Sequence, residues 1–267
     1  MFIEGSLLAD SLVTAIVFLT IASFIAGFID AVAGGAGLVL VPSFMIAGMP
    51  PQLALGQEKL VSTIGTISAI RNFVKDKKVI WKLVPVGVVL GLLGAYVGAR
   101  AILFIDEKLV AQIIVFMLPV GLLFTLFKGK FTAKKVGEMS ENGATKHYLV
   151  AIALVSFIVG FYDGFFGPGT GSLFIIALYL FVKIDLVKAS ATSKIFNFAS
   201  NIGAFVAFSL AGKMLFKLGI PMVMGSLAGN YIGSKLTILK GEKVVKTVLI
   251  LTVNAMLVTL ALKFIFA

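Results

Sequence analysis

The sequence predicts an all-α fold, a polytopic helical membrane protein built from two inverted repeats. Three observations support this prediction. Hydrophobic residues make up 60% of the 267-residue chain and charged residues only 13%, whereas soluble domains carry about 25% charged residues. Apolar segments follow one another along most of the chain. The two halves also repeat the same short motifs in the same order.

The apolar segments are the expected membrane helices. A helix needs about 20 mostly apolar residues to cross the hydrocarbon core of a bilayer. Segments 32–49 and 168–183 are interrupted by Gly and Pro, so we expect broken or re-entrant helices there, and whether they span or re-enter stays open. The candidate segments are 11–29, 32–49, 57–73, 83–104, 109–127, 147–162, 168–183, 188–211, 218–237 and 245–266.

The longest polar stretch, "KGKFTAKKVGEMSENGATK" at 128–146, divides the chain almost in the middle. Its lysines, glycines and asparagine are typical of a solvated loop. The sequence therefore predicts a first transmembrane repeat at 1–127, a cytoplasmic loop at 128–146 and a second transmembrane repeat at 147–267.

The internal repeat rests on matched residues at nearly constant spacing. "GAYVGAR" at 94–100 matches "GNYIGSK" at 229–235. Near the start of each half the offset is 133 residues, and it becomes 135 further along. The matched pairs include Gly27 with Gly160, Asp30 with Asp163, Gly34 with Gly167, Ala54 with Ala189 and Lys59 with Lys194.

The basic loops predict the orientation. Loops 74–82 and 128–146 are rich in lysine, and such loops remain on the cytoplasmic side of a membrane. Counting segments outward from them places both termini outside. Each half then has five membrane segments, or three crossings if its first two segments form a re-entrant hairpin. Both counts are odd, so the second half enters the membrane upside down, as in many secondary transporters.

Two glycine-rich stretches, "GFIDAVAGGAG" at 27–37 and "GFYDGFFGPGTG" at 160–171, predict helix breaks. Glycine and proline free backbone N–H and C=O groups, which at membrane depth need protein, water or a ligand. Helix N-termini at such breaks attract anions. Close helix packing is the alternative interpretation. The predicted substrate contacts from these breaks are Gly34, Gly35, Gly167, Gly169 and Thr170.

Three carboxylates are candidates for proton coupling: Asp30, Asp163 and Glu58. An acidic side chain within a membrane segment is costly and is a functional candidate by default. Asp30 and Asp163 stand beside the glycine clusters. They can carry a proton, or they can accept hydrogen bonds from the broken backbone as helix caps. Both interpretations remain open at the level of sequence.

Lys59 and Lys194 stand near the starts of the two least apolar segments. They can supply positive charge for an anionic substrate, or they can extend to the membrane interface. Asn197, Ser200 and Asn201 share a helical face with Lys194, and the aligned first-half face carries Ser62, Gly65 and Thr66. We expect this face to line the substrate path, with Asn197 and Asn201 as contacts. Hydrogen bonding between helices is the alternative.

Several classes of protein are disfavoured. The chain has no Cys and one His, so disulfides, thiolate metal sites and a Cys nucleophile are excluded. "GGAG" and "GPGTG" lack the surroundings of a nucleotide-binding loop. The net charge of +11 comes largely from cytoplasmic lysines, and nucleic acid is not expected as a partner. We therefore predict no enzyme, no catalytic residue, no metal and no cofactor.

The stretches "GFIDAVAGGAGLVLVP", "ALGQEKL", "GFYDGFFGPGTGS" and "KASATSKIFNFASNIG" resemble the TauE/SafE family of membrane transporters, also called the sulfite exporter or TSUP family. The "GFYDGFFGP" form is most similar to a large, poorly characterised bacterial subgroup. The resemblance covers almost the whole chain. It implies transport of small anions such as sulfite, organosulfonates and related organic acids.

The expected function is thus a secondary transporter, an exporter of small anions coupled to an ion gradient. A passive anion channel is the alternative, and it would need no coupling carboxylates. We expect a multi-pass protein of the plasma membrane, in a bacterium the inner membrane, with a small anion and the lipid bilayer as partners. A homodimer, the substrate, the direction of transport and the coupling ion are left open by the sequence.

Overall fold

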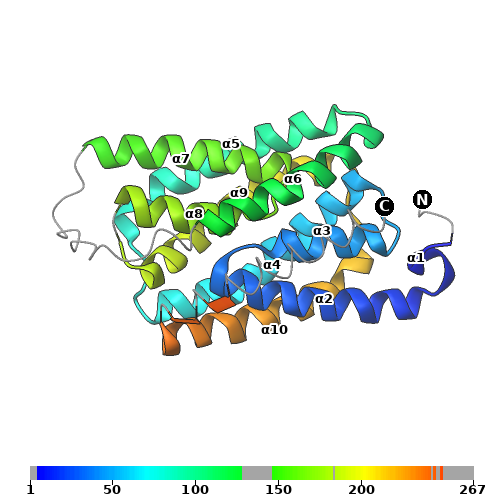
Figure 1. The fold of residues 1–267 in the computed structure, drawn as a ribbon, viewed down its shortest axis with the longest axis horizontal. Coiled ribbons are helices and arrows are strands. Elements are labelled where there is room, and N and C mark those ends of the chain that lie inside the picture. Colours follow the sequence, from blue (N-terminus) through cyan, green and yellow to red (C-terminus); the bar gives the residue numbers. More distant parts are fainter. Residues whose placement is uncertain (1–4, 128–145, 183, 242, 245–246, 249–267) are drawn as a thin grey trace.

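A computed structural model of the chain describes residues 5–127, 146–182, 184–241, 243–244 and 247–248. Every regular element in this described part is helical (Figure 1), which confirms the predicted fold class. In chain order the elements are α1 (Leu7–Asp10), α2 (Leu12–Ala33), α3 (Ala36–Ile46), α4 (Pro51–Lys75), the 3₁₀ turn η1 (Trp81–Leu83), α5 (Val84–Leu103), α6 (Glu107–Phe127), α7 (Lys146–Phe165), α8 (Thr170–Ala177), the π-helical turn η3 (Leu178–Val182), α9 (Leu186–Leu210) and α10 (Phe216–Lys240).

Each of the first nine apolar segments expected from the sequence overlaps one of the helices α2 to α10. The last expected segment, 245–266, falls almost wholly outside the described residues, as does the polar loop at 128–146 apart from Lys146. Local chemistry explains several helix ends. Pro51 occupies the first position of α4, where its missing N–H costs nothing. Asp185 caps α9 by accepting from Val187 N at 3.0 Å and Lys188 N at 2.9 Å.

Helices α2 and α3 form a hairpin around the first glycine cluster. The end of α3 returns to the start of the chain, where Leu8 N donates to Ala47 O at 3.0 Å. Helix α3 has 11 residues, about 16 Å at 1.5 Å per residue. Helices α7 and α8 form the corresponding pair around the second cluster, and α8 has 8 residues. Neither α3 nor α8 alone matches the thickness of a membrane core, about 30 Å.

The most extensive helix contacts run between the two halves of the chain. Helix α2 lies along α10, and α5 lies along α7 (Figure 1). Glycines allow these close approaches: a Cβ on Gly98 of α5 would meet the backbone of Phe161 in α7. In the matching place, a Cβ on Gly233 of α10 would meet the backbone of Phe28 in α2. Such small-residue contacts are typical of helices packed within a membrane.

The outside of the bundle is apolar, and its centre holds polar side chains. Val13, Phe104, Leu154 and Met224 are among the large apolar side chains that remain exposed, which a lipid environment would cover. Within the described residues, the helix Leu12–Ala33 and the continuous helical segment Trp81–Leu103 are long and apolar enough to cross a membrane. The central helices α4 and α9 contact each other and bury polar and charged residues instead. These two helices and the two breaks form the candidate site.

Candidate substrate and ion site

The two glycine breaks meet at the centre of the molecule. Gly34 and Gly35 separate α2 from α3 with φ values of 71° and 150°, which side chains disfavour. Gly167 and Gly169 separate α7 from α8 with φ values of 92° and 88°. Ser172 Oγ lies 2.8 Å from Ala33 O and 2.6 Å from Gly34 O, and donates to these carbonyls freed by the first break. A side chain that follows the second break therefore satisfies backbone carbonyls of the first, and a Cβ on Gly34 would collide with the backbone of Gly171.

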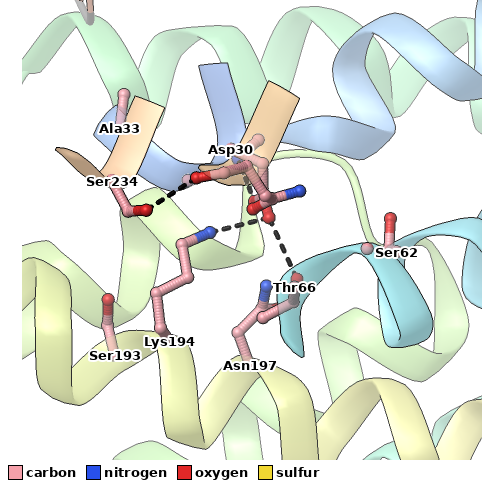
Figure 2. Close-up of polar contacts among 12 residues, drawn as sticks. Asp30, Ala33, Ser62, Thr66, Ser193, Lys194, Asn197 and Ser234 are labelled. Carbon is pink, nitrogen blue, oxygen red and sulfur yellow. Dashed lines mark hydrogen bonds and ion pairs between the residues drawn. The ribbon is translucent and has the colours of Figure 1, made fainter. Parts of the chain in front are cut away.

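A buried ion pair joins α2 to α9. Lys194 Nζ lies 2.7 Å from Asp30 Oδ2, and both side chains are almost fully buried (Figure 2). Thr66 Oγ1 of α4 donates to the same carboxylate oxygen at 3.3 Å. Gly35 N donates to Asp30 Oδ1 at 3.2 Å. Asp30 thus accepts from the broken backbone and pairs with a lysine at the same time. We call Lys194, Asp30 and Thr66 the Lys194 centre.

A second buried cluster joins α4 to α7. Lys59 Nζ lies 2.8 Å from Asp163 Oδ1 and 2.9 Å from Glu58 Oε2. It also donates to Asn201 Oδ1 at 3.2 Å. Two hydroxyls complete the cluster: Ser200 Oγ donates to Asp163 Oδ2, and Ser62 Oγ donates to Glu58 Oε1, both at 2.6 Å. We call Lys59, Glu58, Asp163, Asn201, Ser200 and Ser62 the Lys59 centre.

In both centres the lysine binds an aspartate of the other half. Lys59 of the first half pairs with Asp163 of the second, and Lys194 of the second pairs with Asp30 of the first. Both lysines are only 1% exposed, so neither ammonium extends to an interface. This crossed pairing was not predicted. The only sequence signal for it was that the two matched Asp–Lys pairs repeat in the same order.

A small polar cavity lies at the meeting point. Most of the predicted site residues line it, whereas Lys59, Lys194, Gly34 and Gly169 do not. The first residues of α3, Ala36 and Gly37, line it as well, so the start of that helix adjoins the cavity. The complete lining is Asp30, Gly35, Ala36, Gly37, Glu58, Ser62, Asp163, Gly167, Thr170, Gly171, Asn197 and Asn201.

Sequence reasoning did not select every residue of the site. Ser62, Thr66 and Ser200 belong to the polar faces that the sequence indicated on α4 and α9, but they were not among the predicted contacts. Their hydroxyls hold the three carboxylates. Among the described residues, no group of three or more His, Cys, Asp or Glu side chains is placed to hold a metal ion.

Interrupted helices that meet around buried, paired charges, inside a bundle with an apolar exterior, define a membrane transporter rather than a soluble enzyme. The comparisons agree. The chain belongs to the TauE/SafE family, because the family model described as "Sulfite exporter TauE/SafE" matches residues 19–260. This confirms the resemblance seen in the sequence. The protein is therefore a membrane-embedded transporter.

Individual relatives point to the same class. The chain is 37% identical over 229 residues to a "Probable membrane transporter protein" of Haemophilus influenzae, which covers 85% of this chain and 87% of the relative. It is 35% identical over 231 residues to "Probable membrane transporter protein YfcA" of Escherichia coli K12, covering 86% and 83%. "Probable membrane transporter protein ORF9" of Sinorhizobium is 34% identical over 244 residues, covering 91% of each chain. No solved structure gave a significant match.

Proposed function

We propose that the protein is a secondary transporter that exports small anions, such as sulfite, organosulfonates or related organic acids, across the cell membrane with proton coupling. The family's description names sulfite export, which supports the substrate class and the direction. One observation carries the coupling. Among the described residues, the charged side chains that are buried are two lysines and three carboxylates, all of them in the two centres.

The proposed architecture is a pair of inverted repeats. Helices α2 to α6 form one repeat of five segments, and α7 to α10 with the C-terminal segment form the other. In each repeat the first two segments form a re-entrant hairpin around the glycine break, with a short second helix that returns to the side from which the first entered. The lengths of α3 and α8 support this proposal, as does the Leu8–Ala47 hydrogen bond at the open end of the first hairpin. Three crossings then remain in each repeat, which inverts the second.

The charge balance of the centres links anion binding to a proton. With all five groups ionised, the buried cluster carries one net negative charge, which opposes an anion in the adjoining cavity. A proton on one carboxylate makes the cluster neutral and releases lysine charge toward the cavity. Glu58 is the group in surplus, because Lys59 already pairs with Asp163 at 2.8 Å. We therefore assign the proton to Glu58, with Asp30 and Asp163 as the permanent partners of the lysines.

This scheme gives export a driving force. A dianion that leaves together with one proton carries one net negative charge outward. An inside-negative potential of about 100 mV favours that movement by about 2.3 kcal/mol. A pH gradient directed inward opposes it by about 1.4 kcal/mol per pH unit. A monovalent sulfonate that moves with one proton is electroneutral and follows the pH gradient inward, so within this scheme the driving force for export applies to dianions.

Reconstitution tests the proposal directly. Purified protein in liposomes is given labelled sulfite, sulfonates or carboxylates, with and without a pH gradient and with the potential clamped. We expect at least one of these anions to accumulate above its external concentration only when a gradient is imposed. Equilibration that never exceeds the external concentration would identify a passive anion channel instead. Failure of every anion to move would reject the proposed substrate class.

A further inference from the structure

The interface between α4 and α10 carries a row of buried and partly buried polar side chains beside the Lys194 centre. Ser68 Oγ of α4 is partly buried and donates to Leu227 O at 2.8 Å. Asn72 Nδ2 donates to Ser234 Oγ at 2.9 Å and to Tyr231 O at 3.1 Å. We call this row the α4–α10 seam. Its members are Ser68 and Asn72 on α4, with Ser226, Asn230 and Ser234 on α10 and, one turn further along α10, Thr237, whose hydroxyl donates within its own helix to Gly233 O.

The seam connects Asp30 to one end of the bundle. Asn230 Nδ2 lies beside Gly27, one turn before Asp30, and Ser226 lies beside Gly65, next to Thr66. Gly233, the residue before Ser234, lies against Ala31, the residue after Asp30. From Asn230 the row continues toward the C-terminal ends of α4 and α10, at Lys75 and Lys240. Those ends adjoin the basic stretch 74–82, which our topology places in the cytoplasm.

The matching interface in the other half, between α5 and α9, has no such row. With the offset of 135 residues found in the sequence, Asn72 corresponds to Ala207, and Asn230 and Ser234 correspond to Ala95 and Ala99. These alanines are fully buried within one apolar cluster. The remaining positions correspond to Gly203, Gly91 and Ile102. The same packing is thus achieved without polar groups, so helix association alone does not explain the α4–α10 seam.

One orphaned atom indicates that the seam holds water. Asn230 Oδ1 is buried and has no hydrogen-bond partner among the described residues. A buried polar atom without a partner costs about 1–3 kcal/mol, and ordered water normally satisfies such atoms. The matched residue, Ala95, carries no polar side-chain atom. Asn230 therefore gives the α4–α10 interface a need for water that the matched position of the α5–α9 interface does not have.

We propose that the α4–α10 seam is a hydrated proton route between the cytoplasmic face and the Asp30–Lys194 pair, and that the α5–α9 interface is the dry barrier opposite it. The proposal rests on the proposed function, because the route serves a proton-coupled transporter. Bound water and the side-chain hydroxyls and amides of the seam relay the proton toward Asp30. The cavity at the breaks, which Asp30 and Glu58 both line, connects the route to the surplus carboxylate.

Replacing the polar residues of the seam by the matched residues of the α5–α9 interface tests the route. The triple variant Asn72→Ala, Asn230→Ala and Ser234→Ala copies the matched alanines of the other half. We expect gradient-driven accumulation to fall at least tenfold, while exchange of labelled for unlabelled anion at equal pH continues. Unchanged accumulation would overturn the proposal and leave the seam as helix-to-helix hydrogen bonding. If the wild-type protein accumulated no anion, the proposed function would be rejected. The accessibility of single cysteines to a thiol reagent would then be the test of the hydrated route.

Cysteine accessibility provides that second readout. It also tests the proposal if the triple alanine variant fails to fold. The natural chain contains no Cys, so single cysteines report without background. We expect Asn72→Cys and Ser234→Cys to react with 2-aminoethyl methanethiosulfonate at least tenfold faster than Ala207→Cys and Ala99→Cys. The reaction should occur from the side that labels Asp76→Cys in the exposed stretch after α4. Equal reactivity of the two interfaces, or labelling of the seam from the other side, would overturn the proposal.

Discussion

The Lys194 centre and the Lys59 centre occupy equivalent places in the two halves, yet they differ in charge. The Lys194 centre holds one lysine and one aspartate at 2.7 Å and is neutral. The Lys59 centre adds Glu58 at 2.9 Å to the same kind of pair and carries a surplus carboxylate. The residue that corresponds to Glu58 in the second half is Ser193, whose hydroxyl donates to Ser190 O at 2.8 Å.

A single position therefore separates a neutral site from a negatively charged one. Two matched halves with identical residues would give a symmetric pair of sites that balances each lysine with one aspartate. The difference between Glu58 and Ser193 breaks that balance. Among the described residues, Glu58 is therefore the buried carboxylate in excess of the buried lysines. We infer that the two centres have different roles: one holds the halves together and the other changes its charge.

The largest expected effect comes from comparing Asp30→Asn with Asp163→Asn. Loss of the Asp30 charge leaves Lys194 buried without a carboxylate, which typically costs about 3–5 kcal/mol. Loss of the Asp163 charge leaves Lys59 with Glu58, so the cost should be clearly smaller. Thermal unfolding of the purified variants in detergent measures the difference. Equal losses of stability would show that Glu58 does not act as a counter-ion for Lys59.

The next effect concerns the surplus carboxylate. Glu58→Gln keeps an acceptor for Ser62 but cannot release a proton, so gradient-driven accumulation should fall at least tenfold while exchange at equal pH persists. Glu107→Gln is the matched control, because Glu107 pairs with Lys213 at the partly exposed surface. Flux assays in liposomes measure both variants. Accumulation at the wild-type rate in Glu58→Gln would remove Glu58 from the coupling scheme.

A smaller effect separates the hydroxyls that support the two aspartates. Ser200 Oγ donates to Asp163 at 2.6 Å, whereas Thr66 Oγ1 donates to Asp30 at 3.3 Å. Hydrogen bonds within membrane proteins contribute about 0.6 kcal/mol on average and up to about 1.7 kcal/mol. Ser200→Ala should approach the upper value and Thr66→Val should stay near the average. Denaturant titration of both variants measures their free energies of unfolding. A larger loss of stability in Thr66→Val than in Ser200→Ala would contradict the prediction that the hydrogen bond to Asp163 is the stronger one.

The smallest effect is expected at the surface pair itself. Lys213 Nζ lies 2.9 Å from Glu107 Oε1, but both side chains are partly exposed. Such pairs contribute about 0–1 kcal/mol because water and salt screen them. Lys213→Gln should therefore change the unfolding temperature little, and the change should shrink further in high salt. A loss of stability in Lys213→Gln as large as that in Asp30→Asn would show that the buried ion pairs contribute no more than the surface pair Lys213–Glu107.

Much of the fold could be predicted because its signals are local. Apolar segments, glycine clusters and a motif repeated at a nearly constant offset are visible without any knowledge of contacts. They predicted an all-helical membrane protein, the places of the breaks around Gly34 and Gly167, and the family. The breaks were predictable from backbone chemistry, because glycine adopts positive φ values readily and a cluster of glycines between apolar segments favours a turn.

The sequence by itself therefore determined which residues are available at the membrane centre: Asp30, Glu58, Lys59, Asp163 and Lys194. Only the tertiary structure decided how they are paired. Lys59 finds Asp163 and Lys194 finds Asp30 because α2 packs on α10 and α5 on α7, which brings each half against the other. Partner choice between buried charges depends on distances of a few ångströms, and those distances are set by helix docking across the chain rather than by any spacing along it.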